Sequence, residues 1–408
     1  MSLSFGREYL AIPGPSVIPD KVRQAMHQPS PNIYEGPFAE TIHSVKMDLK
    51  TIAGTSGDVA LYATNGHGVW DAALGNIAAR DEKVLVLATG QFALHWAELA
   101  KSQGVNVQIL DFGNRATIDT HKVRSSLKGD KGHKIKAVLA PHVDTATSIR
   151  NDIAALRCVL DELGHPAILC ADIIASLGCD LVELDEWGVD VAVAACQKGL
   201  MTPAGIGVLF FNKKADEARG ALGQVNAHWD WRTRAMSDQI YPSFFGTPPT
   251  QQVFGLRAAL DMLLFDEGLD MALRRHEVLA KAVWAAIDMW SHPDGLRMTA
   301  ADPTTRSHAV TSVEAVNGGG IRLQRWVKEH LGLTLGRGLG MAGIADPECE
   351  NFFRIGHMGH VNGHMILGVI GAIDAGLKAL DIPHESGALT AATSLIADFT
   401  NSRVLAST

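Results

Sequence analysis

The chain has 408 residues, of which 47% are hydrophobic and 20% are charged. These proportions are typical of a folded globular protein and exclude disordered and fibrous classes. The formal net charge of −8 argues against a nucleic-acid partner, because a basic surface is needed to follow a phosphate backbone. We find no apolar stretch long enough to cross a bilayer and no basic start followed by an apolar run, so we expect a cytoplasmic protein with no membrane partner.

Short apolar runs alternate with amphipathic stretches between about residues 58 and 215, which is the rhythm of β-α-β units. Most of the runs are apolar throughout. Such strands are buried on both faces, so they favour a mostly parallel sheet sandwiched by helices. The candidate strands lie at residues 84–87, 105–110, 137–140, 167–170, 189–195 and 207–211.

The pattern changes after a proline-rich segment at residues 241–249. Two long helical patterns follow, and from about residue 295 strand-like pieces mix with helices. A chain of this length is expected to divide into more than one domain. We therefore predict an α/β fold with three parts: an N-terminal arm (1–20), a large domain with the mostly parallel sheet (21–265) and a small α+β C-terminal domain (266–408).

The sequence does not favour a metal site or disulfides. The cysteines are odd in number, scattered and without CxxC spacing, so we expect reduced core residues. His357, His360 and His364 fall at near-helical spacing, but Gly359 and Gly363 interrupt them and no nearby carboxylate or cysteine completes a site.

An Asn-Gly turn joins an apolar run to a helical pattern in the segment 61–74. Unpaired amides and the helix dipole at such a helix start can bind a phosphate group. An ordinary strand–turn–helix is the alternative interpretation. The segment matches neither GxGxxG nor the P-loop, so it gives a nucleotide site no support.

Asp172 and Lys198 each stand at the end of an apolar run. Ligand-binding groups of α/β sheets lie at such strand ends, so Asp172 either pairs with a cationic ring nitrogen or caps the next segment. A lysine in a low dielectric beside cations has a lowered pKa, and its neutral amine forms imines. The alternative is that Lys198 reaches from its strand end to solvent.

Arg354 lies in an apolar stretch with several glycines, residues 351–360. Its guanidinium matches a carboxylate bidentately, which a substrate α-carboxylate requires, and a structural ion pair is the alternative. The segment His142-Val-Asp144 is compatible with a metal pair or a cofactor contact. No Gly-x-Ser-x-Gly motif appears, so the commonest hydrolase signature of α/β sheets is absent.

Together these motifs resemble the class V aminotransferases, most closely the alanine/serine–glyoxylate branch. The resemblance runs from residues 12–16 to residues 354–359, with similar spacing throughout. It implies fold type I, a pyridoxal 5'-phosphate cofactor and a homodimer with shared active sites. The motifs that carry it are the turn at 65–68, Asp172, Gln197–Lys198 and Arg354.

The resemblance also implies roles for individual residues at the cofactor. Trp96 would stack on the pyridine ring, Asp172 would keep the ring nitrogen protonated, and the Thr145 hydroxyl would reach the phosphate or the phenolic oxygen. The full set of implied cofactor contacts is Gly66, His67, Gly68, Trp96, Thr145, Asp172, Gln197, Lys198 and Thr247.

For the substrate, the resemblance implies that Lys198 is the catalytic base and holds the cofactor as an imine. Asp172 assists by keeping the ring protonated. Arg354 and Tyr34 would bind the substrate, Arg354 through the α-carboxylate and Tyr34 near the entrance. Thr247 would come from the neighbouring subunit.

Three positions depart from the family pattern. Glu35 stands where relatives tend to have a cation near the entrance. Phe244 replaces a tyrosine that usually approaches the phosphate from the partner, although Tyr241 is close in sequence. Ala146 stands where serine or threonine is frequent. These differences leave the substrate open.

We therefore expect a transaminase that moves an amino group from serine, alanine or aspartate to glyoxylate or pyruvate by ping-pong kinetics. One alternative is a lyase or desulfurase of the same fold, for which Cys349 is the candidate nucleophile. The other is a non-catalytic relative that only binds the cofactor.

Overall fold

The computed structural model describes residues 2–237, 239–343 and 345–404. It contains two main sheets, and the larger one has seven strands. Its spatial order is β2-β10-β9-β8-β5-β3-β4. Within it, β10 runs antiparallel to both neighbours, and every other pairing is parallel. The strands are β2 (Asp58–Tyr62), β3 (Lys83–Ala88), β4 (Asn106–Asp111), β5 (Ile135–Pro141), β8 (Ile168–Asp172), β9 (Val191–Ala195) and β10 (Gly207–Phe211).

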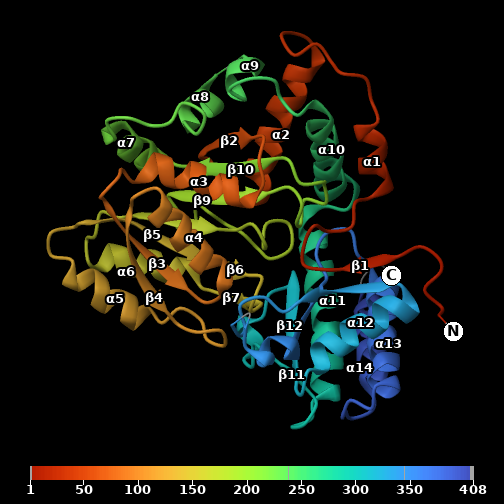
Figure 1. Ribbon diagram of the computed structural model, residues 1–408. Helices are drawn as coiled ribbons and strands as arrows, with labels where there is room; N and C mark the ends of the chain where they lie inside the picture. The colour runs from red at the N-terminus through yellow and green to blue at the C-terminus, as the bar shows by residue number, and fades with distance from the viewer. Residues whose placement is uncertain (1, 238, 344, 405–408) are drawn as a thin grey trace.

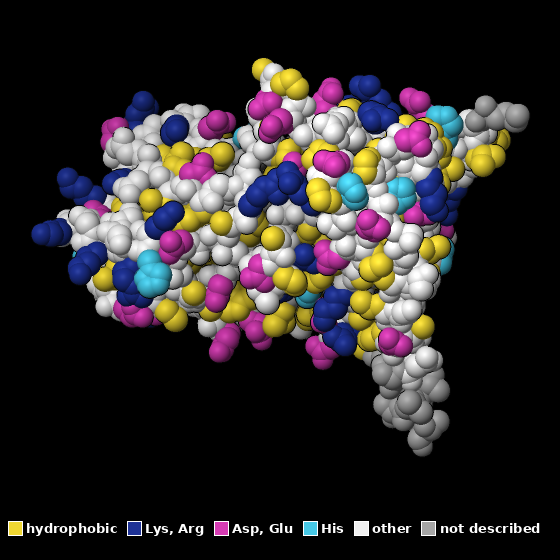
Figure 2. Space-filling view, turned by 90° about the horizontal axis from the view of Figure 1, so that it is seen from below, with side chains coloured by type: hydrophobic (Ala, Val, Ile, Leu, Met, Phe, Trp, Pro, Cys, Tyr) yellow, Lys and Arg dark blue, Asp and Glu magenta, His cyan; other side chains and the backbone are white. Residues whose placement is uncertain are grey.

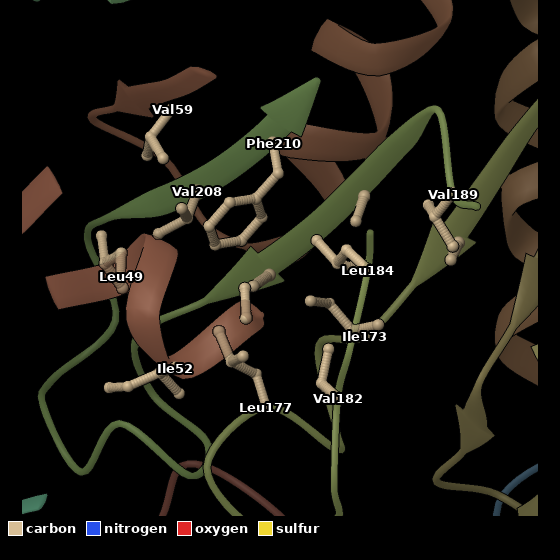
Figure 3. Close-up of a cluster of buried hydrophobic side chains, with 14 of the residues drawn as sticks. Leu49, Ile52, Val59, Ile173, Leu177, Val182, Leu184, Val189, Val208 and Phe210 are labelled. Atoms are coloured by element: carbon tan, nitrogen blue, oxygen red, sulfur yellow. The ribbon is translucent and has the colours of Figure 1, made fainter. Parts of the chain in front are cut away.

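Helices cover both faces of this sheet, as the sequence predicted (Figure 1). They are α1 (Asp20–Met26), α2 (Pro37–Ala53), α3 (Gly66–Ile77), α4 (Gln91–Ser102), α5 (Thr120–Gly129), α6 (Ile153–Glu162), α7 (Lys213–Ala221), α8 (Trp231–Met236), α9 (Ile240–Ser243) and α10 (Thr250–Asp261). Side chains alternate along each strand between two apolar clusters. In β3, Leu85 and Leu87 pack with α2, α5, α6 and α10, whereas Val84 and Val86 pack with α3 and α4. Figure 3 shows part of the first cluster.

The smaller sheet has five strands in the order β1-β13-β14-β12-β11. Its strands are β1 (Tyr9–Ala11), β11 (Leu296–Met298), β12 (Val310–Ala315), β13 (Leu333–Arg337) and β14 (Phe352–Gly356), and its helices are α11 (Leu269–Trp290), α12 (Gly319–Leu331), α13 (Gly363–Ala379) and α14 (Ala388–Val404). The segment that we expected to be an N-terminal arm contributes β1, which pairs in parallel with β13. Figure 1 shows β1, in red, beside the blue elements of this part.

The remaining elements are short. They are β6 (Val143–Asp144), β7 (Ile149–Arg150), a π-helical segment (Met262–Asp266) and two 3-10 helices (Pro303–Thr305 and Pro347–Asn351). The π-helical segment lies between α10 and α11, and the predicted boundary at residues 265 and 266 falls inside it.

Buried polar groups join the small sheet to loops of the large one. Asp180 accepts hydrogen bonds from the Ser307 hydroxyl at 2.8 Å and from the His308 amide at 2.9 Å. The Ser148 hydroxyl accepts one from the Ser312 amide of β12 at 3.1 Å. Because all these groups are largely removed from solvent, separating the two parts would leave them without partners.

Acidic and basic side chains are interspersed on the face shown in Figure 2. Within the described part of the chain, no helix combines the length and the apolar character that a bilayer crossing requires.

Candidate active site

A cavity of about 300 Å³ lies where β8 and β9 end and α3 begins. The carboxyl edge of an α/β sheet is the usual place for a ligand site. The cavity brings together many of the sequence-predicted residues, namely Gly66, His67, Thr145, Asp172, Gln197 and Lys198.

The turn before α3 contains Asn65, the N-cap residue of that helix. The Asn65 side chain accepts hydrogen bonds from the amides of His67 at 3.0 Å and Gly68 at 3.3 Å. Gly68 was predicted to contact the cofactor, but it lies outside the lining of the cavity. A β-carbon at Gly68 would come within 1.8 Å of the Thr64 hydroxyl, so close packing explains this glycine. Gly66 and His67 do line the cavity.

Asp172 ends β8 and its carboxyl group is held by two donors. Its Oδ1 accepts from the Ile174 amide at 2.8 Å, and its Oδ2 accepts from the indole nitrogen of Trp70 at 3.0 Å. Burial raises the pKa of Asp172 to about 7. A cation or a proton placed next to this carboxyl group would relieve the cost of its burial.

Lys198 follows β9, and the N-terminal segment folds against it. Its amine donates to the carbonyl of Pro13, while its own carbonyl accepts from the Ser16 hydroxyl at 2.7 Å. Gly14 has a φ of 97°, which favours glycine, and a β-carbon there would come within 2.6 to 2.7 Å of the end of the lysine side chain. Burial lowers the pKa of Lys198 to about 8, and the charge of Arg354 adds to the effect. The lysine is half-buried, and its amine lies in the cavity lining bound to a main-chain carbonyl, so the alternative in which it reaches from its strand end to bulk solvent is wrong.

Arg354 lies on β14 and is fixed by main-chain carbonyls. Its Nε donates to the carbonyl of Arg337 at 2.6 Å, and its Nη1 donates to the carbonyl of Thr145 at 2.8 Å. Among the described residues it forms no salt bridge within 4 Å, so the structural ion pair is not realised there. Its Nη2 donates to no described residue. Burial lowers the pKa of Arg354 to about 10, and the guanidinium stays charged at neutral pH.

Asp144 acts as a capping residue, which sequence analysis missed. Its Oδ2 accepts from the amides of Phe92 and Ala93 at the start of α4, at 3.0 and 3.2 Å. Its Oδ1 accepts from the Ala146 amide at 2.9 Å. The His142-Val-Asp144 segment is thus explained without a metal ion, and the described residues contain no group of three metal-ligating side chains. The signal for this role that the sequence offered was a carboxylate shortly after an apolar run.

Trp96 does not lie where the resemblance placed it. It is buried and stacks on Trp70, with ring centroids 5.7 Å apart and an interplanar angle of 14°. Phe92, one helical turn earlier, lines the cavity instead. Because α4 begins at Gln91, its first turn faces the cavity and its second turn packs behind Trp70. The glycine just before this helix was the signal that could have identified Phe92.

Tyr34 and Thr247 lie outside the cavity of their own chain. Tyr34 is 79% exposed, and Thr247 is also exposed. Phe244 is buried, whereas the nearby Tyr241 is half exposed. In this chain alone, the structure does not bring these side chains to Lys198.

The residues around the cavity fit pyridoxal 5'-phosphate. Lys198 offers an amine for the aldehyde, and Asp172 offers a buried carboxyl group for a protonated ring nitrogen. The buried Oε1 of Gln197 has no hydrogen-bond partner among the described residues, although Gln197 lines the cavity. The aromatic ring of Phe92 is available for stacking.

Comparison with known proteins gives the same assignment. The family model described as "Aminotransferase class-V" matches residues 63–349. The serine–glyoxylate aminotransferase of Methylorubrum extorquens is 36% identical over 91% of this chain and 93% of its own length. The L-aspartate–glyoxylate aminotransferase of Paracoccus denitrificans is 33% identical over 93% of this chain and 94% of its own.

A solved structure, the ureidoglycine–glyoxylate aminotransferase of Bacillus subtilis, has a TM-score of 0.85 and 22% identity. The alignment covers 97% of this chain and 100% of that one. The chain therefore belongs to the class V aminotransferases. It is a pyridoxal-phosphate-dependent transaminase with the predicted α/β fold of fold type I.

The lowered pKa of Lys198 makes a prediction for the apoprotein. Only the neutral amine attacks an aldehyde, so the rate of reaction with pyridoxal phosphate should rise with pH and level off above about 8, instead of about 10.5. The rate is measured from the absorbance change after mixing, in buffers from about pH 6 to about pH 11. Nα-acetyl-lysine in the same buffers is the control. A protein profile that follows this control would contradict the prediction.

Proposed function

We propose that this transaminase moves an amino group from serine, alanine or aspartate to glyoxylate or pyruvate in a ping-pong reaction. The observation that carries the proposal is that a half-buried lysine and a buried carboxyl group line one cavity, near an arginine whose Nη2 donates to no described residue. The matched relatives act on serine or aspartate and glyoxylate, as their names state.

When bound, pyridoxal phosphate supplies an electron sink that stabilises negative charge on the substrate α-carbon. Lys198 would hold the cofactor through its Nζ until the amino group of the substrate displaces it. The freed amine, with a pKa of about 8, has a substantial neutral fraction near neutral pH and can remove the α-proton as a general base. After that proton has been returned to a different atom, water would hydrolyse the bond between the substrate carbon and its nitrogen, releasing the oxo acid and leaving the amino group for the acceptor.

Asp172 would hold the positive charge of the protonated ring nitrogen. A carboxyl group with a pKa near 7 is only partly ionised at neutral pH when it stands alone. A cationic partner at hydrogen-bond distance favours the ionised form, so cofactor binding and ionisation of Asp172 support each other.

Arg354 would bind the substrate α-carboxylate and thereby orient the α-hydrogen. Two of its nitrogens are fixed by the carbonyls of Arg337 and Thr145, so the guanidinium loses little rotational freedom when a substrate binds. Gln197 and the start of α3 at Gly66 and His67 would contact the cofactor phosphate, and Phe92 would stack on its ring.

We also propose a homodimer in which Tyr34 and Thr247 complete the cavity of the partner subunit. Both side chains are exposed and lie away from the cavity of their own chain. Tyr241 and Phe245, each 49% exposed, add apolar surface to the same part of the chain as Thr247. The cytoplasmic location expected from the sequence stays a prediction.

The alternatives have less support. A desulfurase needs a cysteine that reaches the cofactor, but Cys349 lies in the 3-10 helix Pro347–Asn351, outside the lining of the cavity. A non-catalytic relative has no use for both a base and a substrate arginine, and this chain keeps Lys198, Asp172 and Arg354.

The proposed reaction is tested by half-reactions. The holoenzyme should lose its imine absorbance when mixed with serine, alanine or aspartate, and regain it with glyoxylate or pyruvate. Each candidate is tested separately in a stopped-flow spectrophotometer. Lys198→Ala, which lacks the base, is the control and should show no amine-dependent turnover. If none of the three donors changes the spectrum of the wild-type enzyme, the proposal is wrong.

Arg354 should affect the amino acid and not the cofactor. We expect Arg354→Ala to raise the KM of the amino donor about 10- to 100-fold, because charged hydrogen bonds to the carboxylate are lost. The dissociation constant of pyridoxal phosphate should stay within a few-fold of wild type. Arg354→Lys keeps the charge without the fork and should give an intermediate KM. Loss of the cofactor from Arg354→Lys would assign Arg354 a structural role.

The shared site is tested by mixing two inactive subunits. One carries Lys198→Ala, and the other carries Tyr34→Ala and Thr247→Ala. In a hybrid dimer with shared sites, one cavity keeps Lys198 from one subunit and both other side chains from its partner. Activity should therefore appear in the co-expressed hybrid, purified through two different tags, and in neither parent. If the residues act within their own chain, the hybrid stays inactive.

A further inference from the structure

Trp70 donates the one side-chain hydrogen bond that Asp172 receives from the described residues. The indole nitrogen lies 3.0 Å from Oδ2, and both side chains are buried. The other donor is the main-chain amide of Ile174, at 2.8 Å from Oδ1. Each carboxylate oxygen thus has one donor among the described residues, and of these two donors only the indole can be removed by substitution.

Neighbouring rings hold the indole in this orientation. Trp96 stacks on one side of Trp70 at 5.7 Å, and the ring of His67 meets it edge-on at 4.6 Å. Phe92 approaches at 6.4 Å with an interplanar angle of 64°. A ring packed in this way cannot rotate without displacing its neighbours. The direction of the N–H is therefore set by the packing of α3 against α4.

The electrostatics around Asp172 make this donor consequential. Burial and the nearby charge of Asp144 both raise the pKa of Asp172, while the bonds from Ile174 and Trp70 lower it. Because the carboxyl group titrates near pH 7, removing a donor to its charged form moves the balance toward the protonated acid at working pH. A protonated Asp172 offers no negative charge to a ring nitrogen.

We propose that Trp70 is a positioning residue whose indole N–H keeps Asp172 ionised and directs its carboxylate toward the ring nitrogen of the cofactor. The inference rests on the role proposed above for Asp172. It accounts for a tryptophan that lines the cavity while its polar atom faces away from solvent. Without the indole N–H of Trp70, the proton shared by the ring nitrogen and the carboxylate would reside on Asp172.

The chain offers a matched control for the test. Trp96 is the stacking partner of Trp70, but its buried indole nitrogen has no hydrogen-bond partner among the described residues. Trp70→Phe and Trp96→Phe therefore both remove part of the same ring stack, and only Trp70→Phe removes a donor to Asp172. A third variant replaces Trp70 by β-(3-benzothienyl)alanine, which keeps the shape of the indole and lacks only its N–H.

The readout is the protonation state of the cofactor ring in each holoenzyme. Enzymes loaded with pyridoxal phosphate labelled with ¹⁵N at the ring are compared by NMR, because protonated and neutral pyridine nitrogens have well-separated chemical shifts. We expect a protonated ring in the wild type and in Trp96→Phe. In both Trp70 variants, the pH midpoint for loss of the ring proton should fall by about one to two units. The cofactor dissociation constant should increase about tenfold or more.

Each outcome has a defined meaning. If the benzothienyl variant keeps the wild-type midpoint, the inference about Trp70 is overturned, whether or not Trp70→Phe folds. If Trp96→Phe shifts the midpoint as much as the benzothienyl variant, the effect comes from ring packing and the inference is equally overturned. If the wild-type ring is itself unprotonated, the proposed role of Asp172 fails instead.

Discussion

The site depends on withdrawing two ionisable side chains from bulk water, Asp172 almost fully and Lys198 in part, in one small cavity. Burial alone favours the neutral forms of both groups, which is why the pKa of Lys198 is lowered and the pKa of Asp172 is raised. The lowered pKa of Lys198 favours the proposed reaction, whereas the raised pKa of Asp172 opposes it. A neutral lysine is required for attack and for proton removal, but a neutral aspartic acid cannot stabilise a ring cation. The surroundings must therefore leave Lys198 unpaired with a carboxylate while supplying donors to Asp172, and they do so with Pro13, Ile174 and Trp70.

The loop after β5 connects the parts of the site that have to stay in register. Asp144 caps α4, which carries Phe92, and the carbonyl of the next residue, Thr145, holds Arg354 on the small sheet. The ring proposed to stack on the cofactor and the guanidinium proposed to bind the substrate carboxylate are thus both held by adjacent residues of one loop. A change in the direction of Arg354 would also move the start of α4, so we expect substrate preference to vary at exposed positions such as Glu35.

The sequence predicted the fold class and, through Asp172 and Lys198, part of the cavity lining, because apolar runs with polar ends are local signals. Asp172 and Lys198 each stand at the end of a buried strand, and their strands lie side by side in the sheet. The positions of the residues that the sequence misplaced depend on three-dimensional packing. Trp96 and Phe92 differ only in which turn of α4 they occupy, and that choice depends on where the helix starts. Gly68 was assigned to the cofactor, but its packing against Thr64 is visible only in three dimensions.

The pairing of β1 with β13 sets the order in which this protein can mature. Tyr9 aligns with Leu333, so the segment that covers Lys198 docks on a strand made more than 300 residues later. A ribosome releases the first residues early, yet the pocket of the lysine stays open until β13 has left the exit tunnel. The enclosure of the Lys198 amine by the N-terminal segment therefore has to wait until β13 has been made.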